Sequence, residues 1–474
     1  MMFHSTPFFA LLLVAYAAFW LLAPYRWPRL LVLLLSSLVF YAAWNPAPLL
    51  VFAGIALLNV VSGHLLERWK NVALRKAALA FTVTAHLGVL VLYKYVDLFL
   101  GTVGNLAHAL DVPFTPPRPP GLLLPIGLSF VCFQAISFVV DVYRRQTDGR
   151  RSFVHQLVYL LFFPQVIAGP ILRASELMVP LDKKPHVTSE QGARALLRIA
   201  QGVAKKLLLA DLLAGALVDP VFSNPGGYSA LECVIAAVAY TFQIYFDFSG
   251  YSDIALGVGA LFGFEFPENF NKPYHATNLY EFWNRWHVTL STWLRDYLYR
   301  PLGGNQGTKW QTLRNTMLVM SLGGLWHGAD WRFLVWGGLH GVMLAAWRIW
   351  WWQVGKPRTK DTSFARKFGG WFVMFNAVVF ARIFFRADTM QLALDMFAQL
   401  GTLTVNLARI STLAWGALAA CIVFYVLPAP VFERTNTIFL KSPALVRAAA
   451  LIGLGLIIRQ LASVEAQPYI YFQY

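Results

Sequence analysis

Residues 315–352 read NTMLVMSLGGLWHGADWRFLVWGGLHGVMLAAWRIWWW, and this stretch is the most informative part of the chain for the fold. It is almost entirely apolar, but a Gly-rich segment at 323–331 interrupts it. Basic residues precede it at Lys309 and Arg314 and follow it in 353–367. Because Lys and Arg concentrate in cytoplasmic loops, both ends should lie on the same side of a membrane. We therefore predict a helical hairpin whose turn passes the middle of the bilayer, since about fourteen helical residues rise about 21 Å.

The whole chain has the composition of a membrane protein. Of its 474 residues, 58% are hydrophobic and 13% are charged, whereas a soluble protein carries about 25% charged residues. Apolar runs near the length needed to cross a bilayer, about 20 residues, recur throughout. They lie near 8–24, 30–44, 49–66, 77–98, 121–142, 194–218, 231–264, 331–352, 369–388, 411–428 and 444–462. The predicted fold class is an all-α polytopic integral membrane protein with roughly 11 spanning helices.

Basic residues are unevenly distributed along the chain, whose formal net charge is +16. Positive charge accumulates in cytoplasmic loops, so the arginine-rich loop 144–151 and the loop 353–367 should be cytoplasmic and both termini external. Residues 153–172 are apolar, yet basic residues flank them on both sides and Pro164 and Gly169 break them. We predict a re-entrant or interfacial element there, because irregular backbone at membrane depth must be covered by protein.

The most polar part of the chain is 265–314. Within it, residues 279–299 are expected to form one helix with an aromatic stripe on one face. Two interpretations stay open: an interfacial helix lying flat with its arginines at the headgroups, or the wall of a functional site. The mixture of carboxylates, amides and an imidazole favours the site wall. The polar residues concerned are Glu281, Asn284, Arg285, His287, Arg295 and Asp296.

Few of the ten histidines are candidates for chemistry. His327 lies in the predicted turn, where an ionisable side chain in the membrane is costly and indicates function. The glycines around it indicate space and not tight packing. His340 fits a functional role and a hydrogen-bonded core position equally well, and His86 is expected to form a helix–helix hydrogen bond. No Cys or His pair has the spacing of a zinc site, so no metal is expected.

Five motifs in combination resemble the membrane-bound O-acyltransferase family. They are FPENFNKPY at 266–274, EFWNRWH at 281–287, WLRDYLY at 293–299, PLGGN at 301–305 and GGLWHGA at 323–329. Within that family they are most similar to the bacterial branch typified by the membrane subunit of alginate O-acetylation. The resemblance covers about 125–345 and the last residues of the chain.

The resemblance implies re-entrant and interfacial helices around a central tunnel, with the acyltransferase core at 121–352 between N-terminal helices (1–120) and C-terminal helices (353–474). The family's histidine corresponds to His327 and its second polar catalytic position to His287. Other residues are expected to contact the substrates. Substrate-binding candidates are Asn284, Arg285, Trp326, Arg295 and Asp296, and Arg144 and Arg145 are candidates for the phosphates of coenzyme A.

The implied function is O-acetylation of an exported cell-envelope polysaccharide such as alginate, with acetyl moved across the membrane from cytoplasmic acetyl-CoA. Alternatives are O-acylation of peptidoglycan, teichoic acid or another envelope acceptor, and a transporter without chemistry. We expect no permanently bound cofactor, an extracytoplasmic acetyltransferase partner, no nucleic acid, and a multi-pass location in the bacterial inner membrane. A neutral imidazole at His327 suits a general base. Either His287 or Asn284 would orient it or donate to the thioester carbonyl oxygen.

Overall fold

The computed structural model of the chain describes residues 3, 5–114, 116, 123–355, 363–461 and 469–470. Among these residues the regular structure is helical, and none forms a β-strand. An isolated antiparallel bridge joins Phe270 to Trp286. The predicted all-α class is therefore confirmed.

The α-helices in the first half of the chain are α1 (Thr6–Leu21), α2 (Arg26–Ala42), α3 (Pro48–Arg68), α4 (Val72–Leu90), α5 (Val96–Ala109), α6 (Leu128–Tyr143), α7 (Phe153–Leu161), α8 (Ala174–Asp182), α9 (Ser189–Ala204), α10 (Asp211–Leu213), α11 (Asp219–Ser223) and α12 (Ala230–Leu261). Those in the second half are α13 (Leu279–Trp283), α14 (Val288–Leu294), α15 (Lys309–His327), α16 (Trp331–Val354), α17 (Phe364–Arg386), α18 (Met390–Gly401), α19 (Thr412–Val426), α20 (Ala429–Lys441) and α21 (Ala444–Leu461). Turns of π-helix lie at Val91–Tyr95, Lys205–Ala210, Ala214–Val218 and Arg295–Tyr299, and 3₁₀ turns at Pro225–Gly227 and Pro273–His275.

Several helices are long and apolar enough to cross a membrane, as a polytopic protein requires. In the described part of the chain there are five, namely Pro48–Arg68, Val72–Ala109, Ala230–Leu261, Phe364–Arg386 and Ala444–Leu461. The pair α19 and α20, bent by 86°, makes a sixth if it counts as one span. Other apolar runs form shorter helices such as Thr6–Leu21 and Leu128–Tyr143. Length and composition thus give fewer spans than the roughly 11 expected from apolar runs of about 20 residues.

The described residues form two compact packing units. The first contains the chain up to residue 192 together with 258–267, and the second contains 193–257 and the chain from 268 onwards. The division of the sequence at residues 120 and 352 is a functional one, which packing does not test, and it stays a prediction.

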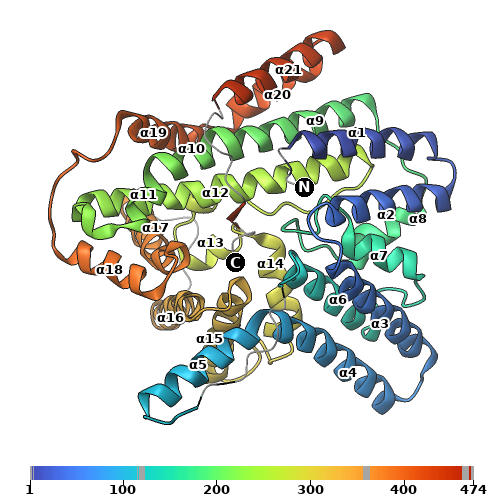
Figure 1. Cartoon of the computed structure of the whole chain (residues 1–474), viewed down its shortest axis with the longest axis horizontal. Helices are drawn as coiled ribbons and strands as arrows, with labels where there is room; N and C mark the ends of the chain where they lie inside the picture. Colours follow the sequence, from blue (N-terminus) through green and yellow to red (C-terminus); the bar gives the residue numbers. More distant parts are fainter. Residues whose placement is uncertain are drawn as a thin grey trace. The chain divides into compact units, whose positions relative to one another are not determined.

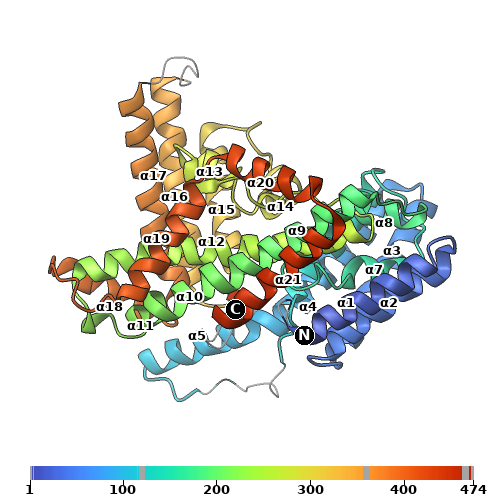
Figure 2. The ribbon, with the colours of Figure 1, turned by 90° about the horizontal axis from the view of Figure 1, so that it is seen from above.

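In the first unit α1 and α2 lie side by side, as Figures 1 and 2 both show. Helix α3 packs on α4, α6 and α7. His86 of α4 forms a hydrogen bond from Nε2 to Asn59 Oδ1 of α3 (2.9 Å), which confirms the predicted helix–helix contact. The apolar stretch 153–172 forms α7 and then irregular backbone. This backbone is covered by protein: Tyr159 Oη donates to the carbonyl oxygen of Leu172 (2.8 Å) deep inside the unit.

In the second unit α15 and α16 form the predicted hairpin, and α16 also packs along α17, visible as an adjacent pair in Figure 2. The helical part of α15 reaches His327 and α16 begins at Trp331, so the turn is only 328–330. Asp330 caps α16, because its carboxylate accepts a hydrogen bond from the backbone N–H of Arg332 (2.8 Å). The hairpin is confirmed, with a tighter turn than the predicted 323–331.

The interpretation of the turn glycines as open space is wrong. A Cβ on Gly328 would stand 2.0 Å from the ring of Phe333, and one on Gly324 would stand 2.2 Å from the carbonyl oxygen of the same residue. Glycine is required here because the two helices approach too closely for any side chain. His327 is therefore held in a tightly packed corner.

The single helix predicted over 279–299 is also wrong. The chain leaves the helical conformation after α13 and resumes it at α14, which continues as a π-helical turn at Arg295–Tyr299. The extended segment 269–271 runs antiparallel to this break. Val288 N–H donates to Asn269 O (3.0 Å) and Asn271 N–H donates to Arg285 O (2.9 Å). These bonds replace intrahelical ones, and periodicity along one segment cannot reveal a partner supplied by another.

Candidate active site

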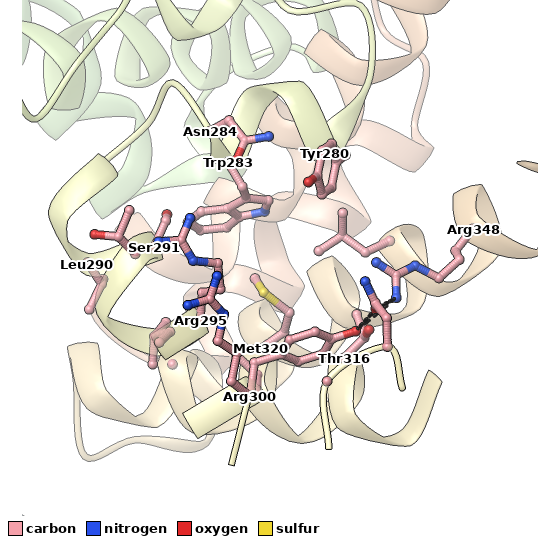
Figure 3. Close-up of a pocket in the computed structure, with 18 of the residues that line it drawn as sticks. Tyr280, Trp283, Asn284, Leu290, Ser291, Arg295, Arg300, Thr316, Met320 and Arg348 are labelled. Atoms are coloured by element: carbon pink, nitrogen blue, oxygen red, sulfur yellow. Dashed lines mark hydrogen bonds between the residues drawn. The ribbon is translucent and has the colours of Figure 1, made fainter. Parts of the chain in front are cut away.

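A cavity of about 560 Å³ lies in the second unit. This volume is within the range of pockets that hold cofactor-sized ligands, about 300–1,000 Å³. Figure 3 shows its walls, with Tyr280, Trp283 and Asn284 on one side and side chains of α14, of the segment 295–306, of α15 and of α16 around the rest. His327, the last residue of α15, also lines it.

Three arginines give this cavity a positive wall. Arg295, Arg300 and Arg348 line it, and no Asp or Glu is among its described lining residues. Arg295 Nε and Arg300 Nη1 both pair with Asp296 Oδ1, at 2.9 and 3.0 Å. One carboxylate thus serves two guanidinium groups, and the excess charge favours an anionic ligand such as a phosphate.

Arg348 is held in place by neutral partners. Its Nη1 donates to Tyr299 Oη (2.9 Å) and to Asn305 Oδ1 (2.7 Å), two residues of the polar segment that follows α14. This cluster fixes the guanidinium at the cavity wall, as Figure 3 shows. Neither partner carries a charge, so the positive charge of Arg348 is available to a ligand.

His327 lies among aromatic rings and is 6% exposed. Its ring centroid is 5.2 Å from that of Trp336 and 5.3 Å from that of Phe385, with the planes nearly perpendicular or steeply inclined. The ring centroid of Trp326, the preceding residue, lies 5.0 Å away. The imidazole therefore lines the cavity from a wall of aromatic rings.

A second, very small cavity of about 10 Å³ also borders on His327. Its described lining residues are Ile244, Phe282, Trp283, Trp286, His327, Trp336, His340, Arg382 and Phe385. His340 forms a hydrogen bond from Nδ1 to the carbonyl oxygen of Trp336, one turn back on α16 (2.9 Å). It thus occupies the hydrogen-bonded core position that was one of its two interpretations.

Arg382 of α17 is the charged member of this lining, and it is 3% exposed. Its Nη1 donates to Tyr274 Oη (2.5 Å) and its guanidinium carbon lies 4.3 Å from the ring centroid of Trp286. No described carboxylate forms an ion pair with it. A buried cation inside a candidate membrane span is costly and marks a functional position.

His287 is fully buried but does not line either cavity. It caps α14 with φ +43°, a left-handed conformation that non-glycine residues seldom adopt and that clusters at functional sites. Its ring lies 4.7 Å from that of Phe248 and 6.3 Å from that of Trp326. Burial lowers the pKa of His287 to about 3, so the imidazole is neutral at physiological pH.

The structure brings some of the other predicted residues to the large cavity and leaves others outside it. Asn284 and Arg295 line it. The ring centroid of Trp326 lies 5.0 Å from that of His327 and 6.3 Å from that of His287, and Asp296 pairs with two cavity arginines. Arg285 instead pairs with Glu281 within α13 and its following turn (2.7 Å).

Arg144 and Arg145 lie in the first packing unit, at the exposed end of α6. They are not among the residues that line the arginine-rich cavity. The residues that sequence reasoning missed are Arg300, Arg348 and Arg382. For Arg348 and Arg382 a signal was available, because each is a cation inside an apolar run, which indicates function by default.

Comparison with known proteins identifies the family of the chain. The membrane-bound O-acyltransferase family profile matches residues 135–387. The chain is 40% identical over 402 residues to the probable alginate O-acetylase AlgI of Pseudomonas aeruginosa, covering 84% of this chain and 74% of that protein. It is 34% identical over 441 residues to the peptidoglycan O-acetyltransferase of Helicobacter pylori (86% and 81% covered). It is 29% identical over 251 residues to the teichoic acid D-alanyltransferase of Bacillus subtilis (49% and 62% covered). The chain thus belongs to the membrane-bound O-acyltransferase family, and it is an O-acyltransferase of the membrane.

Proposed function

We propose that this enzyme takes acetyl from acetyl-CoA and delivers it for O-acetylation of an exported cell-envelope polysaccharide such as alginate. The observation that carries the proposal is one cavity with three arginines on its wall and His327 in its lining. A donor with phosphates at one end and a thioester at the other matches that arrangement, since guanidinium groups bind phosphate oxygens by charge-assisted hydrogen bonds.

The chemistry needs a hydroxyl that becomes a better nucleophile as it attacks. The acceptor oxygen adds to the thioester carbonyl carbon while His327 removes the hydroxyl proton. The tetrahedral intermediate then expels the thiolate of coenzyme A, which takes a proton, and the acetyl ester is left on the acceptor. General-base assistance contributes about 10²–10⁴-fold to such a step. Asn284, which lines the same cavity, is the candidate donor to the carbonyl oxygen.

His287 acts in this proposal through its position and not as a proton carrier. Its folded pKa of about 3 keeps it neutral, and its ring lines neither of the two cavities that His327 lines. It is assigned to holding the α13–α14 break, on which Asn284 lies, in its unusual backbone conformation. This choice favours Asn284 over His287 as the group that contacts substrate.

The acceptor is proposed from the relatives. The names of the relatives with the higher identities state alginate O-acetylation and peptidoglycan O-acetylation. Alginate is preferred because identity to those proteins is 36–40%, against 34% for the peptidoglycan enzyme. Both acceptors lie outside the cytoplasm, so we place the enzyme in the bacterial inner membrane together with an extracytoplasmic acetyltransferase partner that completes transfer to the sugar.

Acetyl transfer by purified protein in proteoliposomes tests this proposal. [¹⁴C-acetyl]-CoA is supplied on one side, and label is counted on mannuronate oligomers or on muramyl glycan, with and without the partner. Label should appear on the mannuronate oligomers and depend on His327. Label on muramyl glycan alone would reassign the acceptor. Uptake of either substrate without any covalent transfer would mean a transporter and overturn the assignment.

A further inference from the structure

The two cavities of the active site share one partition. His327, Trp283 and Trp336 line both the 560 Å³ cavity and the 10 Å³ cavity. The smaller cavity, named the dead end below because its volume leaves room for only one small group, therefore adjoins the donor cavity at the proposed reaction centre. A thioester carbonyl placed at His327 from the donor side would have the dead end next to it.

The dead end is small and its wall includes deeply buried side chains. A volume of about 10 Å³ holds about one water-sized group, which is also the scale of a methyl group. Its wall includes Ile244 of α12 and Phe385 of α17, each buried to 3% exposure. A longer acyl chain would have to displace these side chains, and well-packed interiors resist added methylenes.

The dead end is also positive. Arg382 lines it, and the partners of its guanidinium are a tyrosine hydroxyl, a backbone carbonyl and aromatic faces, with no carboxylate among the described residues. The guanidinium already occupies the faces of Trp286 and Phe282, at 4.3 and 5.8 Å from the ring centroids. Two of the rings that could have received an ammonium by a cation–π contact are therefore taken by the enzyme's own cation.

We propose that this dead end is the acyl pocket and that it selects an uncharged two-carbon acyl group, with Ile244 and Phe385 setting the length limit and Arg382 rejecting acyl groups that carry an ammonium. The inference rests on the proposed thioester donor and deepens it. It separates this enzyme from the relatives named teichoic acid D-alanyltransferases, since a D-alanyl group adds both a methyl and an ammonium to acetyl.

Size selection follows from the volume. One additional methylene in an apolar pocket is discriminated by about 10–200-fold, so wild-type enzyme should prefer acetyl-CoA over propionyl-CoA by at least about tenfold in kcat/KM. Ile244→Ala should relax this preference about tenfold. The matched control is Ile254→Ala, on the same helix and equally buried, but outside the lining of either cavity.

Charge selection is measured with a nearly isosteric pair of donors, D-alanyl-CoA and D-lactyl-CoA, which differ in an ammonium and a hydroxyl. An ammonium beside an uncompensated guanidinium is strongly disfavoured. Ile244→Ala, which makes room for both donors, should use D-lactyl-CoA better than D-alanyl-CoA by on the order of a hundredfold. Adding Arg382→Gln should bring the ratio to within about tenfold, whereas adding Arg382→Lys, which keeps the cation, should leave it high.

Each quantity is a ratio of two donors on one preparation, so partial misfolding of a variant cancels. The acyl-pocket proposal would be overturned if Ile244→Ala left the acetyl-to-propionyl ratio unchanged. It would also be overturned if the D-lactyl-to-D-alanyl ratio were the same with Arg, Lys and Gln at position 382. Wild-type protein that transfers no acetyl at all from acetyl-CoA would instead overturn the proposed function, so the two failures are distinguishable.

Discussion

Gly324 of α15 and Gly337 of α16 face each other across the hairpin, and a Cβ on either would stand 3.0 Å from the Cα of the other. The same added carbon would also stand 2.2 Å from the carbonyl oxygen of Phe333, or 2.3 Å from that of Met320. The two helices can therefore approach this closely near His327 only because neither position carries a side chain.

Substitution of these glycines gives the first prediction. Gly337→Ala should lower the free energy of unfolding by about 1–3 kcal/mol, because the backbones must separate. Gly338→Ala is the matched control, since a methyl group added there would meet nothing within 4 Å and alanine raises helix propensity by about 1 kcal/mol. Thermal unfolding in detergent measures both. Equal losses in the two variants would contradict the close approach.

The second prediction concerns His327. Its replacement by Ala or Gln should reduce acetyl transfer by about 10²-fold or more, the usual share of a general base. Gln is the sharper test, because it fills most of the volume of the imidazole beside Trp336 and Phe385 but cannot accept the proton. His340→Ala is the comparison, with a smaller loss from packing. Near-normal turnover in a folded His327→Gln protein would leave the imidazole a structural role only.

The third prediction concerns the arginine wall. Arg300→Gln and Arg348→Gln should raise KM for acetyl-CoA more than they lower kcat, because they remove binding that is equal in the ground and transition states. KM for S-acetylpantetheine, which lacks the phosphates, should change little. Arg144→Gln and Arg145→Gln test the sequence-based prediction in the same way. An equal rise in KM for both donors would show that the wall arginines do not bind phosphate.

The fourth prediction is a pH dependence of stability that arises from His287. Burial lowers its folded pKa to about 3, whereas the unfolded chain binds the proton near pH 6.5. Its contribution is therefore complete above about pH 6.5 and is lost as pH falls towards 3, with a slope of up to about 1.4 kcal/mol per pH unit.

Unfolding of wild type and His287→Asn between about pH 4 and about pH 8 isolates this contribution. Asparagine tolerates the left-handed backbone at this position, and the other titrating groups are common to both proteins. The slope of the variant should be shallower below about pH 6.5. Parallel curves would mean that the folded imidazole titrates normally.

The fifth prediction concerns topology. Residues 144–151 and 353–367 are predicted to be cytoplasmic and both termini external, from the distribution of basic residues. Gln353→Cys, at the exposed end of α16, should not react with a membrane-impermeant maleimide added to intact cells, and should react after the cells are opened. Ready labelling from outside would show that the ends of the hairpin lie on the external side of the membrane.

Much of the architecture was accessible from the sequence because it depends on local patterns. Apolar runs with basic flanks predicted the α15–α16 hairpin and the position of His327 at its turn, and motif resemblance indicated the family. The meaning of the turn glycines was not accessible. The same Gly-rich pattern is compatible with open space or with close helix contact, and only the facing residues Met320 and Phe333 decide between them.

Two other differences between the sequence-based prediction and the structure have the same cause. The break between α13 and α14 depends on hydrogen bonds from 269–271, and the small cavity depends on Arg382, about a hundred residues further along the chain. Hydrophobic periodicity and helix propensity describe one segment at a time. They therefore cannot predict contacts between segments that are distant in the sequence. A lone cation in an apolar run is the exception, and it was a usable signal for Arg382.

The contact between Arg382 and the aromatic rings of 274–286 has a consequence for biosynthesis. A ribosome adds about 5–20 residues per second, so Trp286 emerges several seconds before the arginine that covers its face. During that interval the nascent enzyme holds Tyr274 and Trp286 without the guanidinium that they contact in the finished protein. The small cavity beside His327 is thus complete only once α17 has been synthesised, and chains released before then carry the motifs at 266–329 without that cavity.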